Sequence, residues 1–138
     1  MAARPLNILL VEDDDVDVMN VSRAFERANI TDPVVRAADG VEALELLRSG
    51  TTPAERLLIL LDLNLPRMNG IELLHELRSD PSLRRIPVVV LTTSNDERDK
   101  VEAFELNVAG YLLKPTTFTD FVELMVALNG YWTRAEMP

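Results

Sequence analysis

The chain has 138 residues, enough for one domain with a sizeable core, and its 47% hydrophobic and 27% charged residues are typical of soluble globular proteins. The absence of cysteine excludes a disulfide framework and a thiolate metal site. No apolar run approaches the length of a membrane span, and the N-terminal MAARPLN lacks the apolar stretch of a signal peptide, so we expect a cytoplasmic protein. A formal net charge of −9 argues against direct binding to nucleic acid, which needs basic surface, and favours a divalent cation or a basic partner.

Short apolar runs alternate with helical patterns through the first half of the chain. The runs at residues 7–11, 34–38 and 56–61 predict strands, because polar or turn-forming residues bound each of them. Apolar residues spaced three or four positions apart predict amphipathic helices over residues 16–28 and 41–48.

The same alternation continues to the end of the chain. A helix is expected over residues 71–78, and strands at 88–91 and 109–113 are each followed by a further helix. Five strand-then-helix units whose strands are apolar on both faces predict a parallel sheet with helices on both sides. We therefore expect an α/β fold with a doubly wound, five-stranded sheet. We also expect one domain over residues 1–138, with no separate output domain.

The last two helices have recognisable caps and apolar faces. Ser94 with Glu97 fits a capping box at the start of the fourth helix, and Thr117 fits the N-cap of the fifth. The fourth helix is expected to turn inward Val101, Phe104 and Val108. The fifth helix is expected to turn inward Phe118, Phe121, Met125 and Leu128.

Carboxylates crowd the end of the first strand, at positions Glu12, Asp13, Asp14, Asp15 and Asp17. We predict that Asp15 is the N-cap of the first helix, because an aspartate there accepts hydrogen bonds from unpaired backbone N–H groups. Asp17 falls in the first turn, where the helix dipole favours negative charge. Asp14 is interpreted as a surface charge beside the site.

Polar residues also follow the other strands. Asp62 ends the third strand, Thr92 ends the fourth and Lys114 follows the fifth, while Glu12 and Asp13 end the first. Each alone would usually be a cap, a turn residue or a solvated charge. Together they predict a site, because ligands of open α/β sheets bind beyond the carboxyl ends of the strands. Crowded carboxylates suit Mg²⁺, and a free carboxylate can attack phosphorus while a lysine neutralises charge.

Over about residues 6–128 the chain resembles the receiver domain of two-component response regulators. Four motifs carry the resemblance, in order: VED (11–13), LLDLNLPRMNG (60–70), VVVLTTS (88–94) and GYLLKP (110–115). Three further stretches resemble the single-domain branch that serves phytochrome-type histidine kinases: VEDD..D (11–17), KPTTF (114–118) and GYW (130–132).

The resemblance implies a role for each matching position. Asp62 would accept a phosphoryl group in a Mg²⁺-dependent reaction. Asp13 would ligate the metal directly, Glu12 mainly through a bound water, and Asn64 through its backbone carbonyl. Asp62 would complete this metal site, and Lys114 would pair with the phosphate.

The resemblance also implies a conformational switch. Thr92 would bind the phosphoryl group, and the rotamer of Tyr111 would follow Thr92. The Lys114–Pro115 peptide bond would be cis, which proline allows at modest cost. Asn64 and Ser94 would flank the site and tune autodephosphorylation.

In functional terms, the resemblance implies a flavodoxin-like sheet with strand order 2-1-3-4-5 and a switch rather than an enzyme. A sensor histidine kinase, of the bacteriophytochrome type on the narrower resemblance, would donate the phosphoryl group. Phosphorylation would then control a partner or a homodimer formed through the fourth helix, fifth strand and fifth helix. Two alternatives remain open. One is a Mg²⁺-dependent phosphohydrolase, although such enzymes usually carry a second aspartate where this chain has Asn64. The other is a phosphate-independent adaptor.

Three further residues lie outside this site. His75, the only histidine, is interpreted as a solvated surface residue. Tyr131 and Trp132 fall in the expected C-terminal tail, residues 129–138, beyond the last helix. They either cap the core or join the last helix in an exposed patch used for association.

Overall fold

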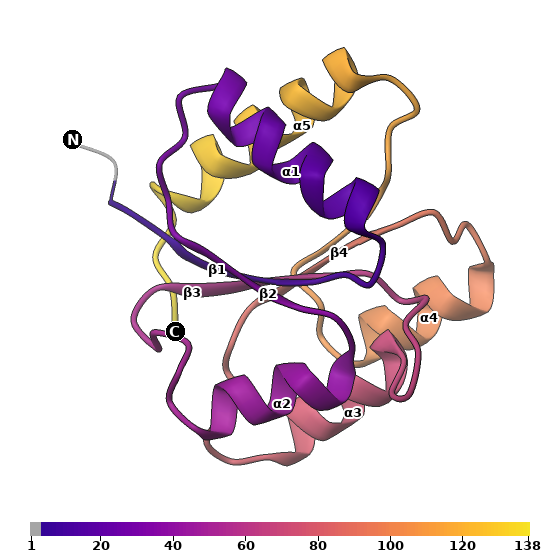
Figure 1. Ribbon diagram of the computed structural model, residues 1–138. Coiled ribbons are helices and arrows are strands. Elements are labelled where there is room, and N and C mark those ends of the chain that lie inside the picture. Colours follow the sequence, from indigo (N-terminus) through magenta and orange to yellow (C-terminus); the bar gives the residue numbers. More distant parts are fainter. Residues whose placement is uncertain (1–3) are drawn as a thin grey trace.

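A computed structural model describes residues 4–138, so residues 1–3 of the domain predicted over 1–138 lie outside the described residues. Strands and helices alternate along the chain (Figure 1). The strands are β1 (Asn7–Val11), β2 (Val34–Ala37), β3 (Leu57–Leu61), β4 (Val88–Thr92) and β5 (Gly110–Leu113). The helices are α1 (Asp15–Arg27), α2 (Gly40–Arg48), α3 (Gly70–Ser79), α4 (Glu97–Glu105) and α5 (Phe118–Trp132).

All strand pairings are parallel, and the strand order is β2-β1-β3-β4-β5. This order confirms the predicted flavodoxin-like topology. Helices α1 and α5 cover one face of the sheet, while α2, α3 and α4 cover the other (Figure 1). Because parallel strands all point the same way, the residues that follow β1, β3, β4 and β5 meet at one edge. Among residues 4–138, no helix combines the length and the apolar character needed to cross a bilayer.

The central strands are buried on both faces, which explains why they read as continuous apolar runs. In β3, Ile59 and Leu61 face the layer of α2, α3 and α4, while Leu58 and Leu60 face α1 and α5. All four side chains are 0% exposed, so each contributes about 1.5–3 kcal/mol through the burial of apolar surface. This two-sided core holds the edge of the sheet where the polar residues gather.

Helix α3 is tied to its surroundings by one arginine. The guanidinium of Arg78 is half-buried and donates hydrogen bonds to the backbone at distances of 2.7–3.2 Å. Its acceptors are the carbonyls of Arg84, Ile86, Leu106 and Asn107. The side chain therefore satisfies backbone carbonyl groups in the loops that lead into β4 and β5.

Two helix caps differ from prediction by one or two residues. The N-cap of α1 is Asp14, not Asp15, because the Asp14 carboxylate accepts hydrogen bonds from the amides of Val16 at 2.8 Å and Asp17 at 3.4 Å. The N-cap of α4 is Asp96, not Ser94. In both cases a neighbouring residue with an equally suitable oxygen lies where the chain turns into the helix. Thr117 caps α5 as predicted, accepting from the Asp120 amide.

The inward face predicted for α4 is wrong. Val101 and Phe104 are each 54% exposed, and Ala103 is the helix's buried residue. Val108, beyond the helix end, is buried as predicted. On α5, Phe118 is also partly exposed, although the rest of its predicted apolar face is buried. Large apolar side chains of α4 and α5 therefore remain on the surface.

The predicted end of the last helix, before residue 129, is also wrong. Helix α5 continues through Trp132, so the two aromatic residues belong to its last turn and not to a tail. Trp132 packs against the core on the α1 and α5 side, whereas Tyr131 is 65% exposed and meets the Trp132 ring edge-on. Trp132 therefore contributes to capping the core, whereas Tyr131 is exposed and its predicted use in association stays a prediction.

Candidate functional site

The candidate site lies at the carboxyl ends of β1, β3, β4 and β5. The backbone amides of three of its residues extend the hydrogen bonding of the sheet. Glu12 N donates to Ala37 O at 2.9 Å, Asp62 N donates to Val11 O at 3.0 Å, and Lys114 N donates to Thr92 O at 2.9 Å. The positions of these side chains are therefore set by strand pairing. The Lys114–Pro115 bond is trans, contrary to the cis bond expected from the resemblance, because this backbone path already brings Lys114 to the site.

The ammonium group of Lys114 is the centre of the site. Its Nζ lies 2.6 Å from Glu12 Oε1, 2.7 Å from Asp17 Oδ2 and 3.1 Å from Asp62 Oδ2. The lysine side chain is only 8% exposed. Its N–H groups donate hydrogen bonds to Asp17 and Asp62, and Glu12 forms the shortest of the three ion pairs. Because Asp17 and then Glu12 accept hydrogen bonds from it, the pKa of Lys114 is raised above its ordinary value despite burial, and the group stays charged.

Asp62 is buried but remains ionised. Its Oδ1 accepts a 2.7 Å hydrogen bond from the fully buried hydroxyl of Thr92 and a longer one, 3.3 Å, from the amide of Asn64. Burial alone would raise the pKa of Asp62. The hydrogen bond from Thr92 and the charge of Lys114 outweigh burial and lower the pKa below its ordinary value. Asp62 is thus a charged, oriented carboxylate, the form required of a nucleophile.

The pKa of Glu12 is shifted in the opposite direction, above its ordinary value. Its residue is 3% exposed, and burial raises its pKa to about 7, although the hydrogen bond and charge of Lys114 oppose the shift. The nearby charge of Asp62 contributes to this rise. Burial and the Asp62 charge therefore outweigh the stabilisation that the Lys114 ammonium gives to the Glu12 carboxylate.

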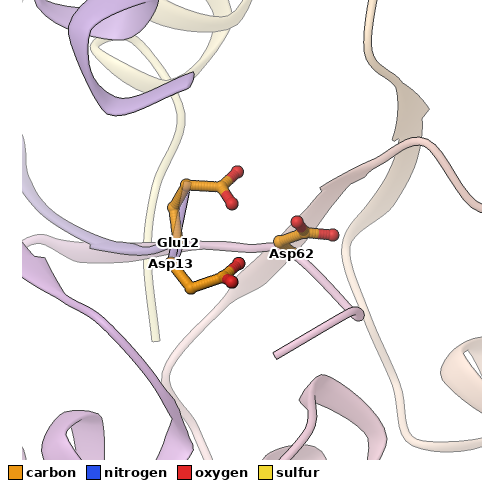
Figure 2. Close-up of side chains that lie close together, drawn as sticks. All are labelled: Glu12, Asp13 and Asp62. Atoms are coloured by element: carbon orange, nitrogen blue, oxygen red, sulfur yellow. The ribbon is translucent and has the colours of Figure 1, made fainter. Parts of the chain in front are cut away.

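The carboxylates fit a divalent cation. Glu12, Asp13 and Asp62 each offer an oxygen, and these oxygens lie within 4.8 Å of one another. The side chains of Glu12 and Asp13 point toward Asp62 (Figure 2). Asp13 is exposed while the other two are buried, so the cluster opens to solvent on one side. Hard divalent cations prefer such oxygen donors, and a cation here would favour the ionised form of Glu12, whose pKa burial and the charge of Asp62 raise.

The loop after β3 closes tightly behind Asp62. The amide of Gly70 donates to Leu63 O at 3.0 Å. A Cβ atom at position 70 would lie 2.6 Å from Leu63 Cα and 2.7 Å from Asp62 O, closer than real contacts allow. Asn64 lies in this loop, exposed at the rim of the site. A glycine at position 70 thus lets the backbone pass directly behind the carboxylate.

The predicted switch residues lie in two places. Thr92 is inside the site, whereas the hydroxyl of Tyr111 donates to the backbone carbonyl of Ser94 at 2.9 Å. The Ser94 amide in turn donates to Thr92 Oγ1 at 3.3 Å, and its hydroxyl donates to Asp99 at 2.6 Å. The loop after β4 therefore connects the site to Tyr111 through hydrogen bonds.

The sequence interpretation missed one residue of the site. Asp17 was assigned only to the first turn of α1, yet its carboxylate accepts from Lys114, 97 positions away along the chain. A local pattern cannot show such a contact, and the only available signal was the final aspartate of the VEDD..D motif. His75 is exposed on α3, as expected for a surface residue.

The sequence matches the response regulator receiver domain family over residues 8–126. The probable methanogenesis regulatory protein FilR2 of Methanothrix harundinacea is 40% identical over 133 residues, which cover 95% of this chain and 86% of that protein. The response regulator Rcp1 of Synechocystis sp. is 38% identical over 132 residues, which cover 93% of this chain and 89% of that protein.

Solved structures give the same result. The phosphorylated cyanobacterial phytochrome response regulator RcpA has a TM-score of 0.87 at 36% identity, with 97% of this chain and 99% of that chain covered. The Mn²⁺-bound form of response regulator Rcp1 has a TM-score of 0.83 at 37% identity, with 97% and 99% covered. The similarity thus extends over nearly the whole length of each chain.

Proposed function

The chain belongs to the response regulator receiver domain family, and from that membership we propose that it accepts a phosphoryl group on Asp62 from a sensor histidine kinase. It then acts as a phosphorylation-controlled switch, working in the cytoplasm as a single receiver domain over residues 1–138. One observation supports Asp62 above all: its buried carboxylate is held ionised between the Thr92 hydroxyl at 2.7 Å and the Lys114 ammonium at 3.1 Å.

The transfer is a displacement at phosphorus. A carboxylate oxygen of Asp62 attacks the phosphorus of a phosphohistidine, the P–N bond breaks, and its electron pair stays on the imidazole nitrogen. Lys114 neutralises charge on the transferred group. When bound by Asp13 and Asp62 beside Glu12, a divalent cation, Mg²⁺ in this proposal, supplies further positive charge to the phosphoryl oxygens. Attack of water on phosphorus later releases phosphate and restores the carboxylate, at a rate tuned by residues at the rim such as Asn64.

The switch uses the hydrogen bonds of the loop after β4. In the structure Thr92 donates to Asp62, and Tyr111 donates to the Ser94 carbonyl. On phosphorylation the Thr92 hydroxyl turns to a phosphoryl oxygen and draws the loop inward. The Ser94 carbonyl moves with the loop, so Tyr111 loses its acceptor and changes rotamer. The surface formed by α4, β5 and α5 responds to this change.

That surface is the proposed homodimer interface. Several large apolar side chains on it are 39–65% exposed, namely Val101, Phe104, Leu113, Phe118, Val126 and Tyr131. An apolar groove of about 300 Å³ runs between β5 and α5, lined in part by Leu112, Leu124 and Trp132. Exposed apolar side chains gathered on one face favour association. Light scattering with and without a phosphoryl donor measures the oligomeric state, and Phe104→Asp is expected to produce a monomer.

The kinase class is proposed from similarity. RcpA is a phytochrome response regulator, and this chain resembles it over nearly its whole length. We therefore expect a bacteriophytochrome-type histidine kinase as the donor. Phosphotransfer profiling against the histidine kinases of the source organism tests this, and rapid transfer only from kinases of another class would contradict it.

Phosphorylation itself is tested with acetyl phosphate and Mg²⁺. Intact-mass spectrometry is expected to show a gain of about 80 Da, the mass of one HPO₃ unit, in the wild type and in Asp120→Asn but not in Asp62→Asn. The absence of any gain in the wild type would indicate a phosphate-independent adaptor. Rapid multiple turnover of small phosphoesters, lost in Asp62→Asn, would indicate a phosphohydrolase.

A further inference from the structure

Lys114 contacts three carboxylates, and Asp17 is the one that neither belongs to the candidate cation site nor accepts the phosphoryl group. Its Oδ2 lies 2.7 Å from Lys114 Nζ, closer than Asp62 Oδ2 at 3.1 Å. The cluster whose oxygens lie within 4.8 Å of one another contains Glu12, Asp13 and Asp62, but not Asp17. The contact of Asp17 is therefore independent of the two groups that change during the reaction.

The fold presents Asp17 to the lysine from a separate element. Glu12 and Asp62 extend from strand ends, whereas Asp17 lies in the first turn of α1, whose start is set by the Asp14 cap. The Asp17 side chain is 26% exposed, so it lies between the buried site and solvent. Lys114 is thus held between two layers, with the strands on one side and α1 on the other.

We propose that Asp17 is a positioning residue for phosphoryl transfer, acting as a permanent anchor for the Lys114 ammonium; this inference rests on the proposed function. Before transfer, the ammonium group of Lys114 contacts Glu12, Asp17 and Asp62. Transfer replaces the Asp62 acceptor with a phosphoryl oxygen, and a bound cation would compete with Lys114 for the Glu12 carboxylate. The Asp17 contact persists throughout, so the flexible lysine chain does not have to be repositioned when the phosphoryl group arrives.

Anchoring and charge predict opposite results. Asp17 adds negative charge to a site that receives an anion, so an effect of charge alone would make its removal accelerate phosphorylation. If Asp17 anchors the lysine, its removal slows phosphorylation, because the ammonium then loses its fixed position. The sign of the change in rate separates the two explanations.

The experiment compares rate constants for phosphorylation by acetyl phosphate at saturating Mg²⁺ in Asp17→Ala, Asp17→Asn and the wild type. We expect a decrease of about tenfold in Asp17→Ala, the order of loss that follows from a misplaced reacting group. A smaller decrease is expected in Asp17→Asn, whose amide oxygen can still accept from Lys114. The matched control is Asp15→Asn, on the same helical turn. Asp15 pairs with Arg36 at 3.0 Å and its side chain is 86% exposed, so this variant should retain the wild-type rate or exceed it.

A second readout separates anchoring from a structural role. In the metal-bound protein without phosphoryl donor, the ¹⁵N-detected ammonium signal of Lys114 should be visible in the wild type and in Asp15→Asn. It should broaden through faster proton exchange in Asp17→Ala, while circular dichroism shows the variant folded. Unchanged or faster phosphorylation in Asp17→Ala, or an unchanged Lys114 signal, would overturn the anchor. Failure of the wild type itself to become phosphorylated on Asp62 would instead refute the proposed function.

Discussion

Proton release on metal binding follows from the environment of Glu12. Burial raises the pKa of this carboxyl to about 7 in the metal-free site, well above its ordinary value of 4.5. A cation favours the ionised carboxylate, so binding must expel the proton that Glu12 carries at acidic pH. The affinity for Mg²⁺ therefore rises as the pH rises through 7. For the same reason, Glu12 in the metal-free folded protein is more protonated than in the unfolded chain between pH 4.5 and 7, and its contribution to stability is lost as the pH rises across that interval.

The size of the effect follows from the fraction of protein that carries this proton. With a pKa of about 7, Glu12 is about nine-tenths protonated at pH 6 and about one-tenth protonated at pH 8. The apparent affinity for Mg²⁺ should therefore be about tenfold weaker at pH 6, equivalent to about 1.4 kcal/mol. At pH 7 each bound ion should release about half a proton.

Isothermal titration calorimetry measures both quantities. Titrations at pH 7 in buffers of different ionisation enthalpy count the released protons, and titrations at pH 6 and pH 8 give the ratio of affinities. Glu12→Gln should remove the proton release and most of the pH dependence, whereas Glu123→Gln, on the exposed side of α5, should change neither. Zero proton release by the wild type at pH 7, or equal affinities at the two pH values, would refute the reasoning.

Three further predictions concern single contacts, two near the site and one at the opposite end of the strands. Gly70→Ala should destabilise the protein by about 1–3 kcal/mol in urea unfolding, because the new methyl group meets backbone atoms that cannot move aside. Gly130→Ala, whose Cβ meets no atom within 4 Å, should be neutral or stabilising by up to about 1 kcal/mol, and equal losses in both variants would contradict this explanation. Arg78→Lys should cost about 2 kcal/mol or more in the same assay, since an ammonium group cannot reach the four carbonyls that the guanidinium satisfies; a loss below about 0.5 kcal/mol would show that those bonds are dispensable. Tyr111→Phe should lower thermal stability by about 1 kcal/mol through the loss of one hydrogen bond to the Ser94 carbonyl, and an unchanged melting temperature would count against that bond.

The order of the elements was predictable because the signals are local and repeated. The run Leu57–Leu61 is apolar on both faces and is bounded by polar residues. In a chain that alternates strands and helices, this pattern favours a central strand of a parallel sheet. The meeting of Asp62, Thr92 and Lys114 was predictable too, since each directly follows or ends a strand of one parallel sheet.

The sequence-based predictions fail where two neighbouring residues suit the same role equally well, or where a residue's partner lies far away along the chain. Asp14 and Asp15 are equally good caps, and only the path of the chain after β1 selects the first. The period of α4 is correct, but period alone does not show that Val101 and Phe104 face away from the sheet. The pairing of Asp17 with Lys114 joins the first helix to the end of the last strand, so it exists only once the sheet is complete.

The hydrogen bonds that extend the sheet into the site also determine when the site exists during synthesis. The acidic residues of β1, α1 and β3 leave the ribosome well before Lys114, which follows the last strand. Until β5 pairs with β4, these carboxylates lack the ammonium group of Lys114, one of the groups that lower the pKa of Asp62. Competence for phosphorylation therefore requires β5 to be in place, because Lys114 reaches the site from the end of that strand. A copy that ends before β5 lacks Lys114, so we expect it neither to signal nor to compete with complete copies for phosphoryl groups.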